Sequence, residues 1–152
     1  PQVESRSAGC VYFAADVAPV DGAYVILDGH GHGPVYNVAV MSHVSPAYAP
    51  PGKHLVAAAL PGAIEGDLES AARRQLRSWW GPQVDNWRHL RTYRIAHGQP
   101  DQTPPFSPKK NVSLGNGIFV CGDHRDTGSI QGAMFSGRRC AEAVTESVRL
   151  SA

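Results

Sequence analysis

The feature that most constrains the fold of this chain is a short apolar run followed by a polar turn and a long amphipathic segment near the C-terminus. The run Ile118–Cys121 is bounded by glycines, and its length and composition predict a strand that is buried on both faces. After the polar turn 124–129, apolar or small residues recur with helical spacing at Ile130, Ala133, Met134, Gly137, Cys140, Ala141, Val144 and Val148. These small residues would let another backbone or a flat ligand approach closely, and the free N–H groups at the start of the helix suit an anion such as a phosphate.

An ordered set of residues across this strand, turn and helix carries a family resemblance. The set comprises Gly122-Asp123, Gly128 to Ala133, Ser136 to Arg139 and Ala141 to Ala143. It resembles the C-terminal flavin-contacting motif of FAD-dependent oxidoreductases of the amine oxidase and phytoene desaturase superfamily. Upstream segments are similar to the last part of the substrate domain in that superfamily, namely 37–40, 45–52 and 90–95. The glycine triplet that opens the nucleotide-binding unit of such enzymes follows no predicted strand in this sequence.

The resemblance implies a domain organisation. Residues 1–108 would form a partial substrate-binding domain, and residues 109–152 would supply the C-terminal strand and helix of an incomplete, Rossmann-type FAD-binding domain. On this interpretation the chain is the C-terminal fragment of a longer flavoenzyme, and its start, without an initiator methionine, agrees with that expectation.

The resemblance also implies a cofactor site and a substrate cavity. The FAD-binding residues would be Gly122, Asp123, Gly128, Ser129, Ile130, Gln131, Gly132 and Ala133. Asp123 would accept hydrogen bonds from FAD hydroxyl groups, or would cap the turn instead, while Gly132 and Ala133 would give the flavin clearance. The residues expected near the reacting atoms are Tyr93, Arg94, Ile95 and His97, although ion pairing on a sheet face explains Arg94 slightly better. Because a flavin performs the redox chemistry itself, no protein nucleophile is expected, and we assign no catalytic residue.

The first two-thirds of the chain predict a mixed, mainly antiparallel sheet with one amphipathic helix packed on it, which makes the fold class α+β. Strands are expected at Cys10–Ala15, Tyr24–Asp28, Val35–Met41, His54–Leu60 and Trp87–Ile95, the first two as neighbours. The helix is expected from Asp67 to Trp80, with Arg73, Arg74 and Arg77 on its solvent face. Prolines predict irregular connections at 45–53 and 100–108.

A glycine-rich loop between the second and third predicted strands carries His30 and His32. Alternate residues of an extended segment point the same way, so the pair invites a metal site, but two imidazoles without a further ligand form an incomplete set. The glycines also resemble a phosphate cradle, although they do not open a helix. We expect a solvent-exposed turn and no metal, with a metal-binding or phosphate-binding loop as the alternative.

Charge and cysteine content narrow the class of protein further. The chain has 14 basic and 13 acidic residues, so it has no broad electrostatic attraction to nucleic acid. Its most apolar stretch, Leu55–Leu60, is far too short to be a transmembrane segment. The three cysteines, Cys10, Cys121 and Cys140, lie in apolar patterns. This favours buried free thiols and an intracellular reducing compartment, such as the cytoplasm or the plastid stroma.

The residues and the resemblance together favour a flavin-dependent oxidoreductase that transfers hydride from an amine or apolar small-molecule substrate to FAD. The missing N-terminal FAD-binding half, or a partner chain that supplies it, would complete the site, and the chain alone is expected to be inactive. Without that half the small-residue face of the helix stays uncovered unless an oligomer covers it. The alternative is a non-catalytic structural or interaction subunit derived from such an enzyme.

Overall fold

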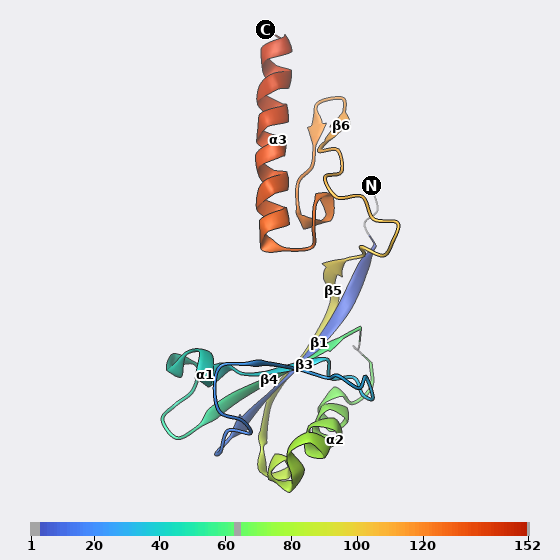
Figure 1. Cartoon of the computed structure of the whole chain (residues 1–152). Coiled ribbons are helices and arrows are strands. Elements are labelled where there is room, and N and C mark those ends of the chain that lie inside the picture. The colour runs from blue at the N-terminus through green and yellow to red at the C-terminus, as the bar shows by residue number, and fades with distance from the viewer. Residues whose placement is uncertain (1–3, 63–64, 152) are drawn as a thin grey trace. The chain divides into compact units, whose positions relative to one another are not determined.

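The computed structural model describes residues 4–62 and 65–151. The chain forms two compact units (Figure 1). The first, here called the sheet unit, is Arg6–Gly98; the second, the helix unit, comprises residues 4–5 and 99–151. Each unit is described by itself, because the position of one relative to the other is not determined.

The sheet unit is built on a five-stranded sheet with the strand order β2-β3-β4-β1-β5. The strands are β1 (Ser5–Ala15), β2 (Val25–Leu27), β3 (Asn37–Val40), β4 (His54–Pro61) and β5 (Arg88–Pro100). The pairs β1/β4, β3/β4 and β2/β3 are antiparallel, so the predicted α+β class with an antiparallel sheet is confirmed.

The prediction that the first two strands are neighbours is wrong. The long strand β1 lies between β4 and β5, whereas β2 lies at the sheet edge beside β3. Val11, Phe13 and Ala15 of β1 are almost completely buried, because this face of the central strand packs into the hydrophobic core. Val25 and Leu27 of β2 are about two-thirds exposed (68% and 67%), as suits an edge strand.

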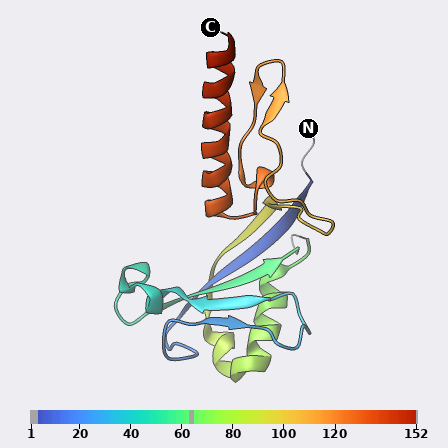
Figure 2. The same ribbon diagram turned by 45° about the horizontal axis from the view of Figure 1, so that its top comes forward.

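Helix α2 (Leu68–Trp80) covers one face of this sheet and completes the core (Figure 2). Its buried residues are Leu68, Ala72 and Leu76, which recur every fourth position and pack in one cluster with Val11 and Phe13. Asp67 caps the helix by accepting a hydrogen bond from the Ser70 amide at 3.1 Å, and hydrogen bonds from Ser70 lower the pKa of this carboxyl. The predicted helix and its start signal are confirmed.

Arg73 does not lie on the solvent face of α2 as predicted. Its guanidinium lies 5.0 Å from the centre of the Phe13 ring, pairs with Glu69 and donates to the carbonyl oxygens of Val84 and Trp87. The two carbonyls become available because the 3₁₀ helix η2 (Gly81–Asn86) turns the chain back along α2. Helical periodicity takes no account of the chain that returns along α2, so it predicted a solvent-facing Arg73.

Two short helices, α1 (Met41–Val44) and η1 (Pro46–Tyr48), connect β3 to β4. The second lies inside the segment expected to be irregular, and its first residue is the proline whose fixed φ suits a helix start.

The helix unit contains a two-stranded sheet, a 3₁₀ turn and the longest helix of the described chain. Its elements are β6 (Ser113–Gly115), β7 (Ile118–Phe119), η3 (Asp123–Arg125) and α3 (Ile130–Ser151). The prediction of a strand buried on both faces is wrong for this chain, because Ile118 is 58% exposed and β7 pairs only with β6 among the described residues.

The long C-terminal helix is confirmed, and it has one covered side and one open side. Gly132 and Ser136 are buried against the turn that precedes the helix. Three apolar side chains of the open side, Ile130, Met134 and Val148, are 79%, 70% and 62% exposed. The apolar face predicted from the sequence is therefore present but uncovered in this chain.

The three cysteines are free, as predicted, but none is fully buried: Cys10 and Cys140 are partly exposed and Cys121 is exposed. Cys121 is exposed because β7 has ended and no described strand lies on that side of it. No helix within the described ranges, 4–62 and 65–151, has both the length and the apolar composition needed to cross a membrane.

Candidate functional site

The turn 122–129 joins β7 to α3 and holds several of the predicted site residues. Gly122 has a φ of 143°, a conformation that favours glycine, and its carbonyl accepts the Arg125 amide at 3.0 Å. The Asp123 carbonyl accepts the Asp126 amide at 2.9 Å. These bonds use backbone groups, and among the described residues the Asp123 carboxylate has no hydrogen-bond partner. The side chain of Asp123 therefore does not cap this turn, and its oxygens are available to a ligand.

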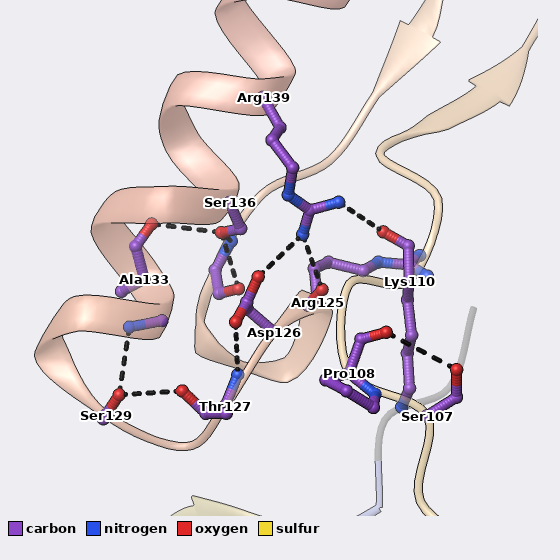
Figure 3. A network of polar contacts seen from close by, with 12 residues as sticks. Ser107, Pro108, Lys110, Arg125, Asp126, Thr127, Ser129, Ala133, Ser136 and Arg139 are labelled. Carbon is purple, nitrogen blue, oxygen red and sulfur yellow. Dashed lines mark hydrogen bonds and ion pairs between the residues drawn. The ribbon is translucent and has the colours of Figure 1, made fainter.

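Ser136 anchors the turn to α3 through hydrogen bonds with the backbone of Gly122. Its hydroxyl is fully buried and accepts a hydrogen bond from the Gly122 amide at 2.8 Å. The same oxygen lies 2.7 Å from the Gly122 carbonyl and 3.0 Å from the Ala133 carbonyl, the contact drawn in Figure 3. Because a hydroxyl has one proton, it donates to one of these carbonyls at a time. The sequence motif includes Ser136, but only the structure shows that it holds Gly122 in place.

A second tie is the ion pair between Asp126 and Arg139 (Figure 3). Asp126 is 7% exposed, and one carboxylate oxygen lies 3.1 Å from the Arg139 guanidinium while the other accepts the Thr127 amide. Arg139 also donates to the carbonyl oxygens of Arg125 and Lys110. One guanidinium thus joins the turn, α3 and the segment before β6, a role that the sequence analysis missed because these residues are distant along the chain.

Three nitrogen atoms in this region are buried without an acceptor among the described residues. They are Nε and Nη2 of Arg125 and Nε of Arg139. A buried donor without a partner costs free energy, so such atoms point to a missing acceptor.

The start of α3 has two satisfied and two open amides. The Ser129 hydroxyl accepts the Gly132 amide at 3.0 Å, and the Ser129 carbonyl accepts the Ala133 amide at 3.0 Å. No acceptor among the described residues meets the amides of Ile130 and Gln131, and both residues are exposed. The positive end of the helix is therefore accessible at these two positions.

Contacts within the chain account in part for the glycines of the turn and of the start of α3. A Cβ atom on Gly132 would lie 1.9 Å from the Thr127 carbonyl oxygen, so the turn occupies the space that the missing side chain leaves. The Gly128 amide donates to Gln102 Oε1 at 3.0 Å. The contact of these glycines with a flavin stays a prediction.

The second group of predicted site residues lies on β5 in the sheet unit. Tyr93 is 44% exposed and meets Tyr12 edge to face, with ring centres 5.8 Å apart. Ile95 and His97 are exposed as well. Arg94 donates to the Gly66 carbonyl at 2.7 Å, a contact that ties β5 to the segment before α2. Tyr12 was not predicted for this site, and its side chain points away from the core. The pKa of Tyr12 is raised, mainly by burial and to a smaller extent by the neighbouring Cys10.

Three solved structures share this fold. They are an oxidoreductase from Methanosarcina mazei (18% identity, TM-score 0.55), a protein from Pyrococcus furiosus (14%, 0.61) and a candidate protoporphyrinogen oxidase from an Exiguobacterium species (17%, 0.67). The alignments cover 92%, 94% and 99% of this chain but 35%, 33% and 36% of those chains, so it spans about a third of their length. The fold is thus one found in oxidoreductases.

The family follows from the sequence model of the flavin containing amine oxidoreductases, which matches residues 2–145. The chain belongs to this family. No match to a curated protein was found.

Proposed function

We propose that this chain is the C-terminal part of an FAD-dependent oxidoreductase that transfers hydride from an amine or apolar small molecule to FAD. The family is named for its flavin, which supports a flavin cofactor. The observation that carries the proposal is the set of unsatisfied polar groups at the turn 122–129 and the start of α3. The Asp123 carboxylate and the amides of Ile130 and Gln131 have no partner among the described residues, although an ordered network fixes the backbone around them.

The available groups fit the two kinds of polar atom that a flavin nucleotide carries. The Asp123 carboxylate is acceptor-only when ionised, so it suits the hydroxyl groups of the ribityl chain or ribose. The amides of Ile130 and Gln131 are donors at a positive helix end and suit an electron-rich ring edge. When bound, the flavin supplies the hydride acceptor. The chain's own residues orient it and place positive potential beside it.

The unpartnered nitrogens of Arg125 and Arg139 are enclosed by protein atoms, so a ligand oxygen has no access to them and we assign them no contact with FAD. We include Gly122, Asp123 and residues 128–133 as the part of the FAD site that this chain supplies.

On the sheet unit, we propose that the exposed surface around Tyr93 and Ile95 contacts the substrate. The rings of Tyr93 and Tyr12 meet edge to face on this surface and suit an apolar molecule, while the Tyr93 ring already carries the Arg91 guanidinium 5.1 Å from its centre. His97 is exposed on the same strand. Arg94 is assigned a structural role through its bond to Gly66.

We infer that a Rossmann-type nucleotide-binding half, from the rest of a longer chain or from a partner chain, completes the FAD site. The chain spans about a third of the structures it resembles, and the apolar side of α3 is exposed, which supports a missing neighbour. The free cysteines support a reducing compartment, the cytoplasm or the plastid stroma.

A second candidate rests on the same exposed side of α3. A non-catalytic subunit descended from a flavoenzyme would also cover Ile130, Met134 and Val148 with a partner. The two candidates differ in whether the assembled protein contains flavin.

The test uses the gene product that contains this chain, purified with its bound cofactor. We expect the purified protein to show the absorbance of oxidised flavin. An amine or apolar substrate, added under anaerobic conditions, should reduce the flavin and so remove this absorbance. Asp123→Ala should lower flavin content or affinity at least about tenfold, since it removes hydrogen bonds to a charged acceptor. Asp21→Ala is the matched control, because Asp21 is an exposed turn aspartate of the sheet unit and should leave flavin content unchanged. A colourless protein with no affinity for FAD, held in a stable complex, would instead support the second candidate.

A further inference from the structure

We propose that the loop between β2 and β3, together with one side of α2, forms a binding site for a small oxyanion of the phosphate or carboxylate class. The loop, here called the histidine loop, comprises residues 28–35. It faces a cavity of about 490 Å³ lined by His30, His32, Gly33, Arg74, Ser78 and Trp79, among others. The volume lies in the range of small-ligand pockets, and the whole cavity belongs to the sheet unit. It shares no residue with the turn 122–129, so this inference does not rest on the flavin proposal.

The histidine loop is clamped by the side chain of Gln75 from α2. Gln75 Oε1 accepts the Val35 amide at 2.8 Å, while Nε2 donates to the Val35 carbonyl at 2.9 Å and to Asp28 Oδ2 at 3.0 Å. One amide therefore holds both ends of the loop. A Cβ atom on Gly33 would lie 2.2 Å from Gln75 Oε1, so any other residue at this position would displace the amide that clamps the loop. The sequence predicted a solvent-exposed turn, and His30 and His32 are exposed; the contacts add that the turn is held in place by α2.

Asp28 organises the interior of the loop, and both of its carboxylate oxygens accept hydrogen bonds within it. Its carboxylate accepts the His30 amide at 2.9 Å as well as the Gln75 side chain. The backbone hydrogen bond from His30 is the largest cause of its lowered pKa, with further backbone bonds from Gly31 and His32. These donors offset the negative charge at the cavity wall. They also fix the backbone so that the rings of His30 and His32 stack, with centres 5.8 Å apart and planes 22° apart.

Arg74 supplies a cation across the cavity from the histidines. Its neighbours on α2 are engaged, because Arg73 pairs with Glu69 and Arg77 pairs with Asp85 at 3.0 Å. Arg74, in contrast, forms no hydrogen bond or ion pair within residues 4–62 and 65–151; it interacts with the Asp67 carboxylate through charge alone, and it lines the cavity. A guanidinium presents a planar set of donors that matches the two oxygens of a carboxylate or phosphate. Each imidazole adds at least one polar nitrogen, and the indole of Trp79 forms an apolar wall.

The same residues fit a metal ion poorly. No group of three His, Cys, Asp or Glu side chains among the described residues is arranged to hold one. Asp28 would be the third ligand of the histidine pair, but its oxygens already accept bonds from His30 and Gln75. A guanidinium beside the site also repels a cation. The observations therefore favour an oxyanion.

The experiment titrates the full chain with sodium phosphate, and in parallel with sodium acetate, at constant ionic strength set by chloride. Binding is followed by NMR through the ring signals of His30 and His32 and the amides of Gly31 and Gly33. We expect a saturable shift of these signals with at least one of the two anions. The stronger of the two identifies the ligand as a phosphate or a carboxylate.

Three variants test the assigned roles. Arg74→Ala should weaken binding at least about tenfold, because it removes a charge-assisted donor pair. Arg74→Lys should give an intermediate affinity, since it keeps the charge without the planar fork. Arg77→Ala is the matched control: it removes the same charge from the same exposed side of α2 and should leave binding unchanged. Equal melting temperatures of Arg74→Ala and the parent chain establish that the fold is intact.

The proposal is overturned if neither anion produces a saturable shift, or if Arg77→Ala weakens binding as much as Arg74→Ala, which would indicate unspecific charge attraction. It is also overturned if zinc chloride alone gives tighter, histidine-dependent binding that Arg74→Ala improves, since the loop would then be a metal site.

Discussion

Two glycines of α3 should respond in opposite directions to replacement by alanine. Gly132 faces the Thr127 carbonyl, and its Cβ would lie 1.9 Å from that oxygen. Gly137, five residues further along the same helix, would place its Cβ where, apart from the adjacent residues and backbone of the helix itself, no heavy atom lies within 4 Å. Because the atom opposite Gly132 belongs to the backbone, it cannot rotate away, and the turn must move. We therefore expect Gly132→Ala to destabilise the helix unit and Gly137→Ala to stabilise it.

The magnitudes follow from two opposing effects. Alanine favours a helix interior over glycine by about 1 kcal/mol, and Gly137→Ala should realise about 0.5–1 kcal/mol of that. At Gly132 the same gain is outweighed by overpacking, for which about 2–3 kcal/mol is reasonable against a backbone atom, leaving a net loss of about 1–2 kcal/mol. These values correspond to roughly 2–5-fold slower amide exchange in α3 for Gly137→Ala and roughly 5–30-fold faster exchange for Gly132→Ala.

Amide hydrogen exchange of the α3 residues, measured by NMR on the isolated chain, is the appropriate assay because it reports on the helix unit alone. Each variant serves as the control for the other, since both add one methyl group to a glycine of the same helix. If Gly132→Ala protects α3 as well as Gly137→Ala does, the Thr127 carbonyl does not lie against Gly132, and our account of the turn is refuted.

Two further predictions concern buried and capping hydroxyl and carboxyl groups. Ser136→Ala should destabilise the helix unit by about 1–3 kcal/mol, because the Gly122 amide loses its buried acceptor. Amide exchange of α3 measures this loss. The control is Thr145→Ala, which deletes an exposed hydroxyl, and an equal effect of the two variants would contradict the prediction. Asp67 has its pKa lowered by hydrogen bonds from Ser70, so its contribution to the start of α2 is present above the ordinary carboxyl pKa and is lost as the pH falls through the lowered value. NMR below pH 4 should show the first turn of α2 fraying in the parent chain. In Asp67→Asn the amide still caps the helix but does not titrate, so this pH dependence should disappear. An equal pH dependence in the parent chain and the variant would contradict the assignment to Asp67.

The sequence predicted the elements that have a strong periodic signal. Helix α2 begins after Asp67 and ends at Gly81 as its cap signals indicated, and α3 carries its apolar residues on one side as the spacing required. Strand β4 matches its predicted range within one residue. In these segments local preference and tertiary packing agree, so local reasoning was sufficient.

The errors arose where a distant partner decides the structure. The place of β2 at the edge depends on which strands cover β1, and that is a property of the whole sheet. Arg73 is held against Phe13 by the carbonyl groups of Val84 in η2 and of Trp87 just after it, which lie 11 and 14 residues further along the chain. The apolar run at Ile118 predicted burial, but Ile118 is exposed, because β6 is the one strand that pairs with β7 in the described part of the chain.

The candidate flavin site was also predicted only in part from the sequence. Motif reasoning selected the residues of the turn and the start of α3, whose roles toward a flavin stay predictions. It did not find the network of Asp126 and Arg139, because an ion pair between positions 13 residues apart leaves no local pattern. It also did not find that Arg74 faces the histidine loop, since that contact needs the register of α2 against the sheet.

The open side of α3 has a practical consequence for anyone who handles the isolated chain. Ile130, Met134 and Val148 remain in contact with water along one stripe of the helix. The attraction between such stripes grows on warming from cold solution, because the ordering of water around carbon costs entropy. The isolated polypeptide should therefore be most monodisperse when it is cold and dilute, and should cluster reversibly as it is warmed.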